Sequence, residues 1–417
     1  MELLIFREHH NYPDGEYISK DVVPTIPGPI YFKGMEESFC IKMDSRRKVH
    51  SSYFIGTDWL TSEKAVYVEP KLNKDTNQIN YLRMLLSTLE HSDVSIHIND
   101  LFEIKYSQPL IEIPQERDML TPMLVLYFLQ TLRVIVRKGL KKSYYRVYNN
   151  LQGKVKGKIL VSDTIKQNIL KNKTLSNHCA YDEFGYNNLE NRLLKKTLLF
   201  VNRYLKEVGI RQVSDELSKQ LNSLFAAFQQ VDSEISLNEI KYRKPNPIYR
   251  EYNTAIRLAK IILWRYGYSI GNIRNQTKIK TPPFWIDMSK LFELYVLGLL
   301  KNNFGEHVDY HVVIRERELD YLLNSGDHKM VIDAKYKKYN EHSVNIEDIR
   351  QVCGYARMEG VYRRLNFPEN LNIPCLIIYP DMMGGVDNFY GSSFPMAMEK
   401  IPGYKDLYKL GVKLPQY

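Results

Sequence analysis

The chain has 417 residues, 44% of them hydrophobic and 25% charged, which is enough for two or three domains and a sizeable core. Its formal net charge of +10 suits a partner with a phosphate backbone, although an ordinary basic protein has the same balance. The four cysteines are far apart and form no Cys-x-x-Cys pair, which argues against a zinc site or a disulfide framework.

The sequence has neither the pattern of a signal peptide nor an apolar run long enough to cross a membrane. The first ten residues lack the basic and then apolar layout of a signal peptide. The longest apolar run, Met123 to Leu129, is too short to span a bilayer. We therefore expect a cytoplasmic protein with no membrane partner.

The first part of the chain is predicted to be β-rich. Residues 1 to about 80 contain short β-type segments, such as 39–43 and 65–68, separated by proline and glycine turns. This pattern predicts a small β-barrel or sandwich, and we place a first domain at 1–110.

From Tyr81 onward the apolar residues recur with helical spacing, and we expect a mainly helical second domain over 111–280. The expected helices are 81–89, 121–138, 189–206, 214–229 and 249–266. Within this region, Gly153 to Ile159 invites a phosphate-loop interpretation. A P-loop needs four residues between its glycines and a Ser or Thr after the lysine, and this stretch has neither. We therefore expect no nucleotide bound by this chain and interpret the stretch as a basic β-turn.

The last part, 281–417, is predicted to alternate helices and strands. Residues 286–302 form an amphipathic helix that Asp287 can cap, and Glu293 lies among its apolar positions. Segments 319–323 and 330–336 form a hairpin across turn residues. A second helix is expected at 345–359 and a buried strand at 375–379.

Three residues of this hairpin suggest chemistry. Asp320 lies on its first strand, and Asp333 and Lys335, two residues apart, project from one face of its second strand. Paired carboxylates without histidine or cysteine suit Mg²⁺, which lowers the pKa of a bound water. A neighbouring lysine can orient that water or stabilise charge on phosphorus. These residues predict phosphodiester hydrolysis, although an acid-x-Lys triplet also arises by chance in so charged a chain.

The order of these elements resembles the PD-(D/E)XK nuclease core, in particular its RecB-like branch, although Leu319 replaces the usual proline before the first aspartate. The resemblance implies an α+β multi-domain protein with an N-terminal β-domain, a central helical domain and a C-terminal α/β nuclease core. It implies catalytic roles for Asp320, Asp333 and Lys335. Metal binding is implied for Glu293, Asp320 and Asp333, with Mg²⁺ as the cofactor and Mn²⁺ as a substitute. Gln351 and Tyr355 would support the site or touch the DNA backbone.

Lys337 and Lys338 follow the catalytic strand. They are candidates for contact with DNA phosphates, since each neutralised phosphate releases counterions. A charged strand end exposed to solvent is the alternative for both.

Several separated motifs resemble those of the McrC family. They are Ala65-Val-Tyr-Val-Glu-Pro70-Lys71-Leu72, the segment 151–159, His178 to Phe184, Asn191-Arg-Leu-Leu-Lys195 and Asp333-Ala-Lys-Tyr-Lys337. The resemblance implies the nuclease subunit of a methylcytosine-dependent restriction complex that cuts double-stranded, methylated DNA. It also implies a partner, a McrB-like hexameric GTPase of the AAA type, whose GTP hydrolysis the N-terminal portion stimulates.

Two other hypotheses remain open. One is a stand-alone RecB-like repair nuclease, which would cut DNA with metal alone. The other is a regulator whose nuclease fold has lost activity. The clustered carboxylates argue against the regulator, because like charges repel when no metal pairs with them.

Overall fold

A computed structural model describes residues 2–9, 28–45, 48–72, 79–88, 94, 97, 101–114, 118–207, 215–235, 249–266, 278–326, 328–337, 345–389, 394 and 397–416. Over these residues the chain is a mixed α+β protein with nine α-helices and several sheets, as predicted for its class. It forms two compact units, one of Met1–Met123 with Thr277–Tyr417 and one of Leu124–Gln276. The boundaries 1–110, 111–280 and 281–417 stay a prediction.

The N-terminal part of the first unit has two sheets around one core. A five-stranded sheet has the order β1-β6-β5-β13-β7, and a three-stranded sheet has the order β2-β3-β4. Both contribute side chains to a core that includes Phe6, Phe54 and Trp285. The strands are β1 (Glu2–Arg7), β2 (Ile30–Tyr31), β3 (Phe39–Met43), β4 (Val49–Ser51), β5 (Phe54–Trp59), β6 (Lys64–Glu69), β7 (Phe102–Ile104) and β13 (Phe284–Asp287).

One strand of this N-terminal sheet comes from a distant part of the sequence. β13 pairs with β5 on one side and β7 on the other, so Ile286 belongs to a strand and not to the predicted helix. The helix α8 (Met288–Phe304) starts directly afterwards, and the Asp287 carboxylate accepts a hydrogen bond from Lys290 N as its N-cap. Asp287 therefore ends a strand of one sheet and begins the first helix of the C-terminal region.

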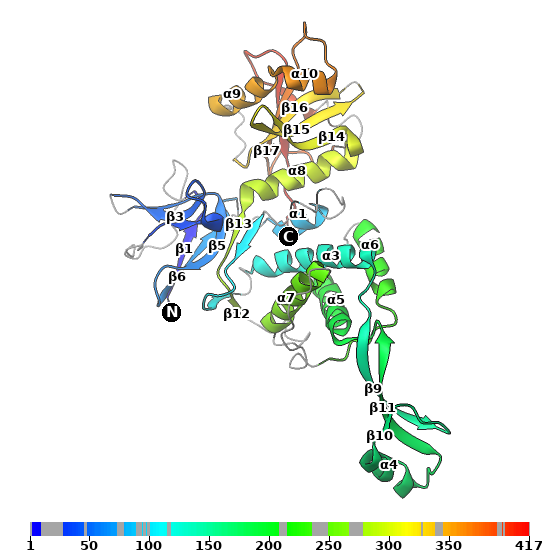
Figure 1. The fold of residues 1–417 in the computed structure, drawn as a ribbon. Helices are drawn as coiled ribbons and strands as arrows, with labels where there is room; N and C mark the ends of the chain where they lie inside the picture. Colours follow the sequence, from blue (N-terminus) through cyan, green and yellow to red (C-terminus); the bar gives the residue numbers. More distant parts are fainter. Residues whose placement is uncertain are drawn as a thin grey trace. The chain divides into compact units, whose positions relative to one another are not determined.

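The C-terminal part of the first unit is built on a six-stranded sheet with the order β14-β15-β16-β17-β19-β18. β14 to β16 are antiparallel, while β16, β17 and β19 run parallel. Figure 1 shows α8 and the α9–α10 pair on opposite sides of this sheet. The remaining bounds are β14 (Val308–Ile314), β15 (Arg317–Ser325), β16 (His328–Ala334), α9 (Ile346–Tyr355), α10 (Glu359–Leu365), β17 (Cys375–Pro380), β18 (Glu399–Lys400) and β19 (Leu407–Val412).

The predicted hairpin, capped helix and buried strand of this region are all present, with two corrections. β16 ends at Ala334, so Lys335 follows the strand, although its N–H still donates to Ile378 O of β17. The helix predicted at 345–359 ends at Tyr355, and α10 begins at Glu359. Asn345 caps α9 as expected, accepting from Glu347 N.

Shorter elements complete the first unit. They are η1 (Phe32–Gly34), α1 (Tyr81–Thr88), the antiparallel pair β8 (Ile111–Pro114) and β12 (Lys278–Thr281), and η9 (Gly305–His307).

The second unit combines helices with a long hairpin. Its helices are α3 (Leu120–Lys138), which begins in the first unit, α4 (Val161–Gln167), η4 (Ile169–Lys171), α5 (Leu189–Glu207), α6 (Asp215–Ala227) and α7 (Arg250–Arg265). β9 (Ser143–Gln152) and β11 (Ser176–Gly185) pair along ten residues each, and β10 (Lys158–Ile159) joins β11. Figure 1 shows this hairpin projecting from the helices of the unit. The sequence did not predict it.

One described helix, α3, is long and apolar enough to cross a membrane. Its most apolar 18-residue window is 72% buried in the structure, as in the core helix of a folded domain.

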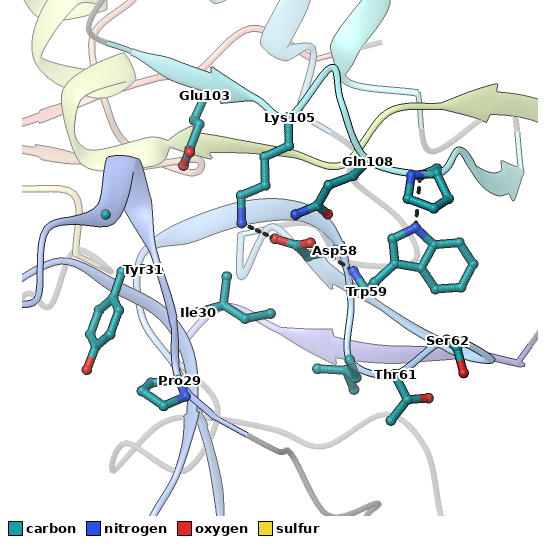
Figure 2. A pocket seen from close by; sticks show the side chains of 13 residues that line it. Pro29, Ile30, Tyr31, Asp58, Trp59, Thr61, Ser62, Glu103, Lys105 and Gln108 are labelled. Carbon is teal, nitrogen blue, oxygen red and sulfur yellow. Dashed lines mark hydrogen bonds and ion pairs between the residues drawn. The ribbon is translucent and has the colours of Figure 1, made fainter.

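A buried carboxylate joins three strands of the N-terminal sheet. Asp58 on β5 accepts from Lys105 Nζ at 2.6 Å, just after β7, and from Trp285 Nε1 at 2.9 Å on β13. Figure 2 shows the Asp58–Lys105 pair in the wall of a cavity of about 810 Å³. Because Asp58 is paired with Lys105 and Trp285, we assign these polar groups a structural role in the sheet and not a role in binding a ligand.

We expect Asp58→Ala to destabilise this sheet by about 3–5 kcal/mol, because Lys105 and the Trp285 indole lose a buried partner. Urea unfolding followed by tryptophan fluorescence measures the change. Glu112→Ala removes the exposed pair with Lys278 and serves as the control, with a cost below about 1 kcal/mol. Equal costs for the two variants would contradict the role of Asp58.

Candidate active site

Two predicted metal ligands lie where β15 and β16 separate. Tyr321 pairs with Ile332, and one further step of this antiparallel register brings Asp320 level with Asp333. The Asp320 carboxylate accepts from Ala334 N at 2.9 Å, so its side chain holds the end of β16. The structure therefore brings these two carboxylates together, as the sequence predicted.

Lys335 completes the cluster. Its Nζ lies 2.9 Å from Asp333 Oδ2, and the pair is mostly shielded from solvent. Apart from this ion pair, both oxygens of Asp333 are buried and have no hydrogen-bond partner among the described residues. A buried carboxylate without hydrogen bonds is costly, so Asp333 is suited to bind a cation.

Burial and the charge of a neighbouring carboxylate raise the pKa of both aspartates. Burial raises the pKa of Asp320 to about 6, and the charge of Glu293 adds to the effect. Burial and the Asp320 charge raise the pKa of Asp333 to about 7. Burial alone would lower the pKa of Lys335, but the two aspartates outweigh it and the pKa is raised. Lys335 therefore stays protonated at neutral pH and is a donor rather than a base.

Glu293 on α8 faces the same site but is engaged by a histidine. Glu293 Oε2 lies 3.6 Å from His311 Nε2, and His311 Nδ1 lies 2.7 Å from Glu318 Oε1. The Glu293 carbonyl accepts from Tyr321 Oη at 2.6 Å, which fixes α8 against β15.

His311 is a site residue that the sequence did not reveal. The β14–β15 register puts it level with Asp320, between the pairs Tyr310–Tyr321 and Val312–Leu319. Its φ of 48° lies in the left-handed region, which costs energy for a residue other than glycine. The sequence pattern predicted no strand before the hairpin, and only the folded structure brings His311 beside Glu293.

The donor set fits a magnesium ion held partly by water. The described residues contain no group of three or more His, Cys, Asp or Glu side chains already arranged to hold a metal. Mg²⁺ commonly uses one or two carboxylates together with waters and phosphate oxygens. Asp320 and Asp333 can supply these two carboxylates, and Glu293 would join only after leaving His311.

The remaining predicted residues lie at the edge of this cluster or outside it. Gln351 Nε2 donates to Tyr355 Oη at 2.9 Å on α9, and neither side chain has a polar contact with the two aspartates in the described part of the chain. Lys337 Nζ donates to Asp348 at 2.7 Å, so a DNA phosphate would compete with that carboxylate. Lys338 lies outside the described residues.

The fold and the site define a mixed α+β protein in which a buried carboxylate, a half-buried carboxylate and a lysine meet where β15 and β16 separate. The model of the McrBC 5-methylcytosine restriction system component family matches residues 51–368, and the chain belongs to this family. Its motifs resemble McrC, as the sequence indicated.

Two solved structures are similar to this chain. One is in the refined half-complex from the tetradecameric assembly of Thermococcus gammatolerans McrB AAA+ hexamers with bound McrC, with 17% identity, coverage of 89% of this chain and 80% of that chain, and a TM-score of 0.37. The other is in the cryo-EM structure of the Thermococcus gammatolerans McrBC complex, with 15% identity, coverage of 72% and 87%, and a TM-score of 0.29. A search among curated proteins gives no match.

We expect Asp333→Asn to stabilise the metal-free protein by about 1–3 kcal/mol at pH 8 and by less at pH 5. The raised pKa means that the folded state favours the neutral carboxyl, so wild-type stability falls as pH rises towards about 7. Asparagine does not ionise and avoids this loss. Thermal unfolding in EDTA at both pH values measures the difference.

Asp309→Asn is the matched control, because Asp309 forms an exposed pair with Arg364. A lower stability of Asp333→Asn at pH 8 would show that the ion pair with Lys335 outweighs the burial of charge.

Proposed function

We propose that this chain is the Mg²⁺-dependent DNA endonuclease subunit of a methylcytosine-dependent restriction complex that acts in the cytoplasm. The observation that carries the proposal is the contact of Lys335 with a buried, partly unpartnered Asp333 beside Asp320. Membership of the McrBC restriction family supports it independently.

Each side chain has a distinct role in hydrolysis of a DNA phosphodiester. Asp320 and Asp333 would hold the ion, with Glu293 as a further ligand. Bound Mg²⁺ would polarise the phosphate and lower the pKa of the attacking water. The protonated Lys335 donates hydrogen bonds to that water and to the phosphate oxygens, and its charge offsets the negative charge that develops on them. Mn²⁺ has similar ligand preferences and would substitute.

The proposed partner is a McrB-like hexameric GTPase whose GTP hydrolysis this chain stimulates. The sequence assigned partner binding to 1–110, and that assignment stays a proposal. The hairpin of the second unit, taken together with the segment 153–175 that joins its strands, offers another surface, because large exposed apolar side chains gather there. Tyr144, Tyr148, Leu170 and Leu175 are 69–74% exposed.

We expect the chain to cut methylated double-stranded DNA only with the GTPase, GTP and Mg²⁺ all present. The test compares the chain alone and with the GTPase, each with and without GTP, on methylated and unmethylated plasmid. EDTA should abolish cutting. Lys335→Ala should reduce it by at least about 100-fold, because one preorganised donor typically contributes that much.

Lys335→Ala should still assemble with the GTPase, and loss of assembly would contradict the role assigned to Lys335. Cutting by the chain with metal alone would identify a stand-alone RecB-like repair nuclease instead. No cutting in any mixture would support a regulator without activity.

We expect the double variant Leu170→Ser, Leu175→Ser to bind the GTPase at least about tenfold more weakly, as measured by co-elution on size exclusion. Burial of the two leucines in the complex would contribute up to about 6 kcal/mol. The variant should keep the wild-type melting temperature, since both side chains are exposed. Leu371→Ser, on an exposed leucine of the first unit, is the control. Unchanged affinity of the double variant would remove the hairpin as the docking surface.

A further inference from the structure

A lysine of the N-terminal sheet reaches the segment that carries Lys335. Lys71 follows β6, and its Nζ donates to Tyr336 O at 2.9 Å. The same ammonium lies 4.3 Å from the centre of the Tyr336 ring. Lys71 belongs to the Glu-Pro-Lys motif of the sequence, for which the proposed hydrolysis has no use. Its contact is with the residue next to the catalytic lysine.

A buried glutamate holds Lys71 in place. β1 and β6 are parallel and end together, and Glu8 N donates to Glu69 O at 2.8 Å. Glu8 and Lys71 therefore leave the same end of the sheet, where Glu8 Oε1 lies 3.3 Å from Lys71 Nζ. The Glu8 side chain is 0% exposed and that of Lys71 only 12%.

This pair is poorly explained by stability alone. Burial raises the pKa of Glu8 to about 7 even beside Lys71. Burial also lowers the pKa of the neighbouring His9 to about 3, and the charges of Lys71 and Lys337 lower it further, so His9 is neutral and adds no charge. Burying an ion pair costs about as much as the pair returns, and apolar residues of the same size would stabilise the sheet equally well. An apolar pair in place of Glu8 and Lys71 would, however, leave Tyr336 O without this hydrogen-bond donor.

Contacts with several other elements fix the short segment 335–337. Lys335 N donates to Ile378 O of β17, and Lys337 Nζ donates to Asp348 of α9. Tyr336 lies between these two lysines, and its carbonyl oxygen accepts the hydrogen bond from Lys71, which follows β6 of the N-terminal sheet. The ring of Tyr336 also lies 6.0 Å from that of Phe292, the residue before Glu293. A shift of Lys71 would therefore move Tyr336, and with it both Lys335 and the part of α8 that carries Glu293.

We propose that Lys71, held by Glu8, is a positioning residue for Lys335, and that the N-terminal sheet thereby controls whether the nuclease site is assembled. The inference rests on the proposed nuclease function. Its chemistry is simple: the ammonium fixes the carbonyl of residue 336, and the preceding side chain keeps its place beside Asp333. Movement of the ends of β1 and β6 would release that carbonyl.

The test compares Lys71→Met, Lys71→Arg and Glu8→Gln with a control, Lys64→Met. Lys64 begins β6, the strand that Lys71 follows, but its pair with Glu2 is exposed. Two measurements are made on the full chain with its GTPase partner: DNA cleavage kinetics, and amide hydrogen exchange of the peptide that contains 335–337 in the absence of DNA.

We expect Lys71→Met to lower kcat by about 10- to 100-fold, as loss of an outer contact at a metal site does, with KM for DNA and co-elution with the partner unchanged. Exchange of the 335–337 peptide should be faster. Lys71→Arg should recover part of kcat, since it keeps a charged donor. Glu8→Gln should give a smaller change in the same direction and replaces Lys71→Met if that variant does not fold.

Wild-type kcat and exchange in Lys71→Met, as in Lys64→Met, would overturn the inference. So would a raised KM with unchanged exchange, which would make Lys71 a DNA contact. If the wild-type complex does not cut DNA, the proposed function fails, and the exchange measurement alone decides whether Lys71 orders the segment.

Discussion

The structure depends on keeping two carboxyl groups close together, Asp333 buried and Asp320 half-buried. Asp320 and Asp333 meet where β15 and β16 separate, and burial and repulsion raise the pKa of both. A fold selected for stability alone would avoid this arrangement. Lys335 offsets part of the cost through its ion pair with Asp333. The bond from Ala334 N to Asp320 offsets another part and fixes the strand end from which Lys335 projects.

The surrounding elements serve this constraint by holding the strand end rigid. β17 binds the backbone of Lys335, and α9 presents Asp348 to Lys337. Glu293 is brought by α8, whose carbonyl at that position accepts from the buried Tyr321. His311, in a left-handed backbone conformation, lies 3.6 Å from the Glu293 carboxylate, whose charge still raises the pKa of Asp320. The candidate site is thus partly preorganised: the two aspartates already lie together, and Glu293 would join them only after leaving His311.

The N-terminal sheet and the candidate site are joined in two ways. β13 lies between β5 and β7, and Asp287 at its end caps the helix that carries Glu293. Lys71 reaches Tyr336 from the ends of β1 and β6. A change in the sheet would therefore reach Glu293 through the main chain and Lys335 through the contact of Lys71 with Tyr336. This arrangement suits a nuclease whose activity depends on another event, such as the binding of a partner.

The sequence by itself determined the local features of this protein. Helical spacing and caps located α8 and α9 within two to four residues, because Asp287 and Asn345 act within one helical turn. The acid-x-Lys pattern and the hairpin identified Asp320, Asp333 and Lys335, since neighbouring strands of a hairpin must pair. Only the tertiary structure decided that Ile286 belongs to the N-terminal sheet, that His311 faces Glu293 and that Lys71 binds Tyr336 O. These contacts join residues up to 265 positions apart, and no local periodicity encodes them, because packing between separate elements sets them.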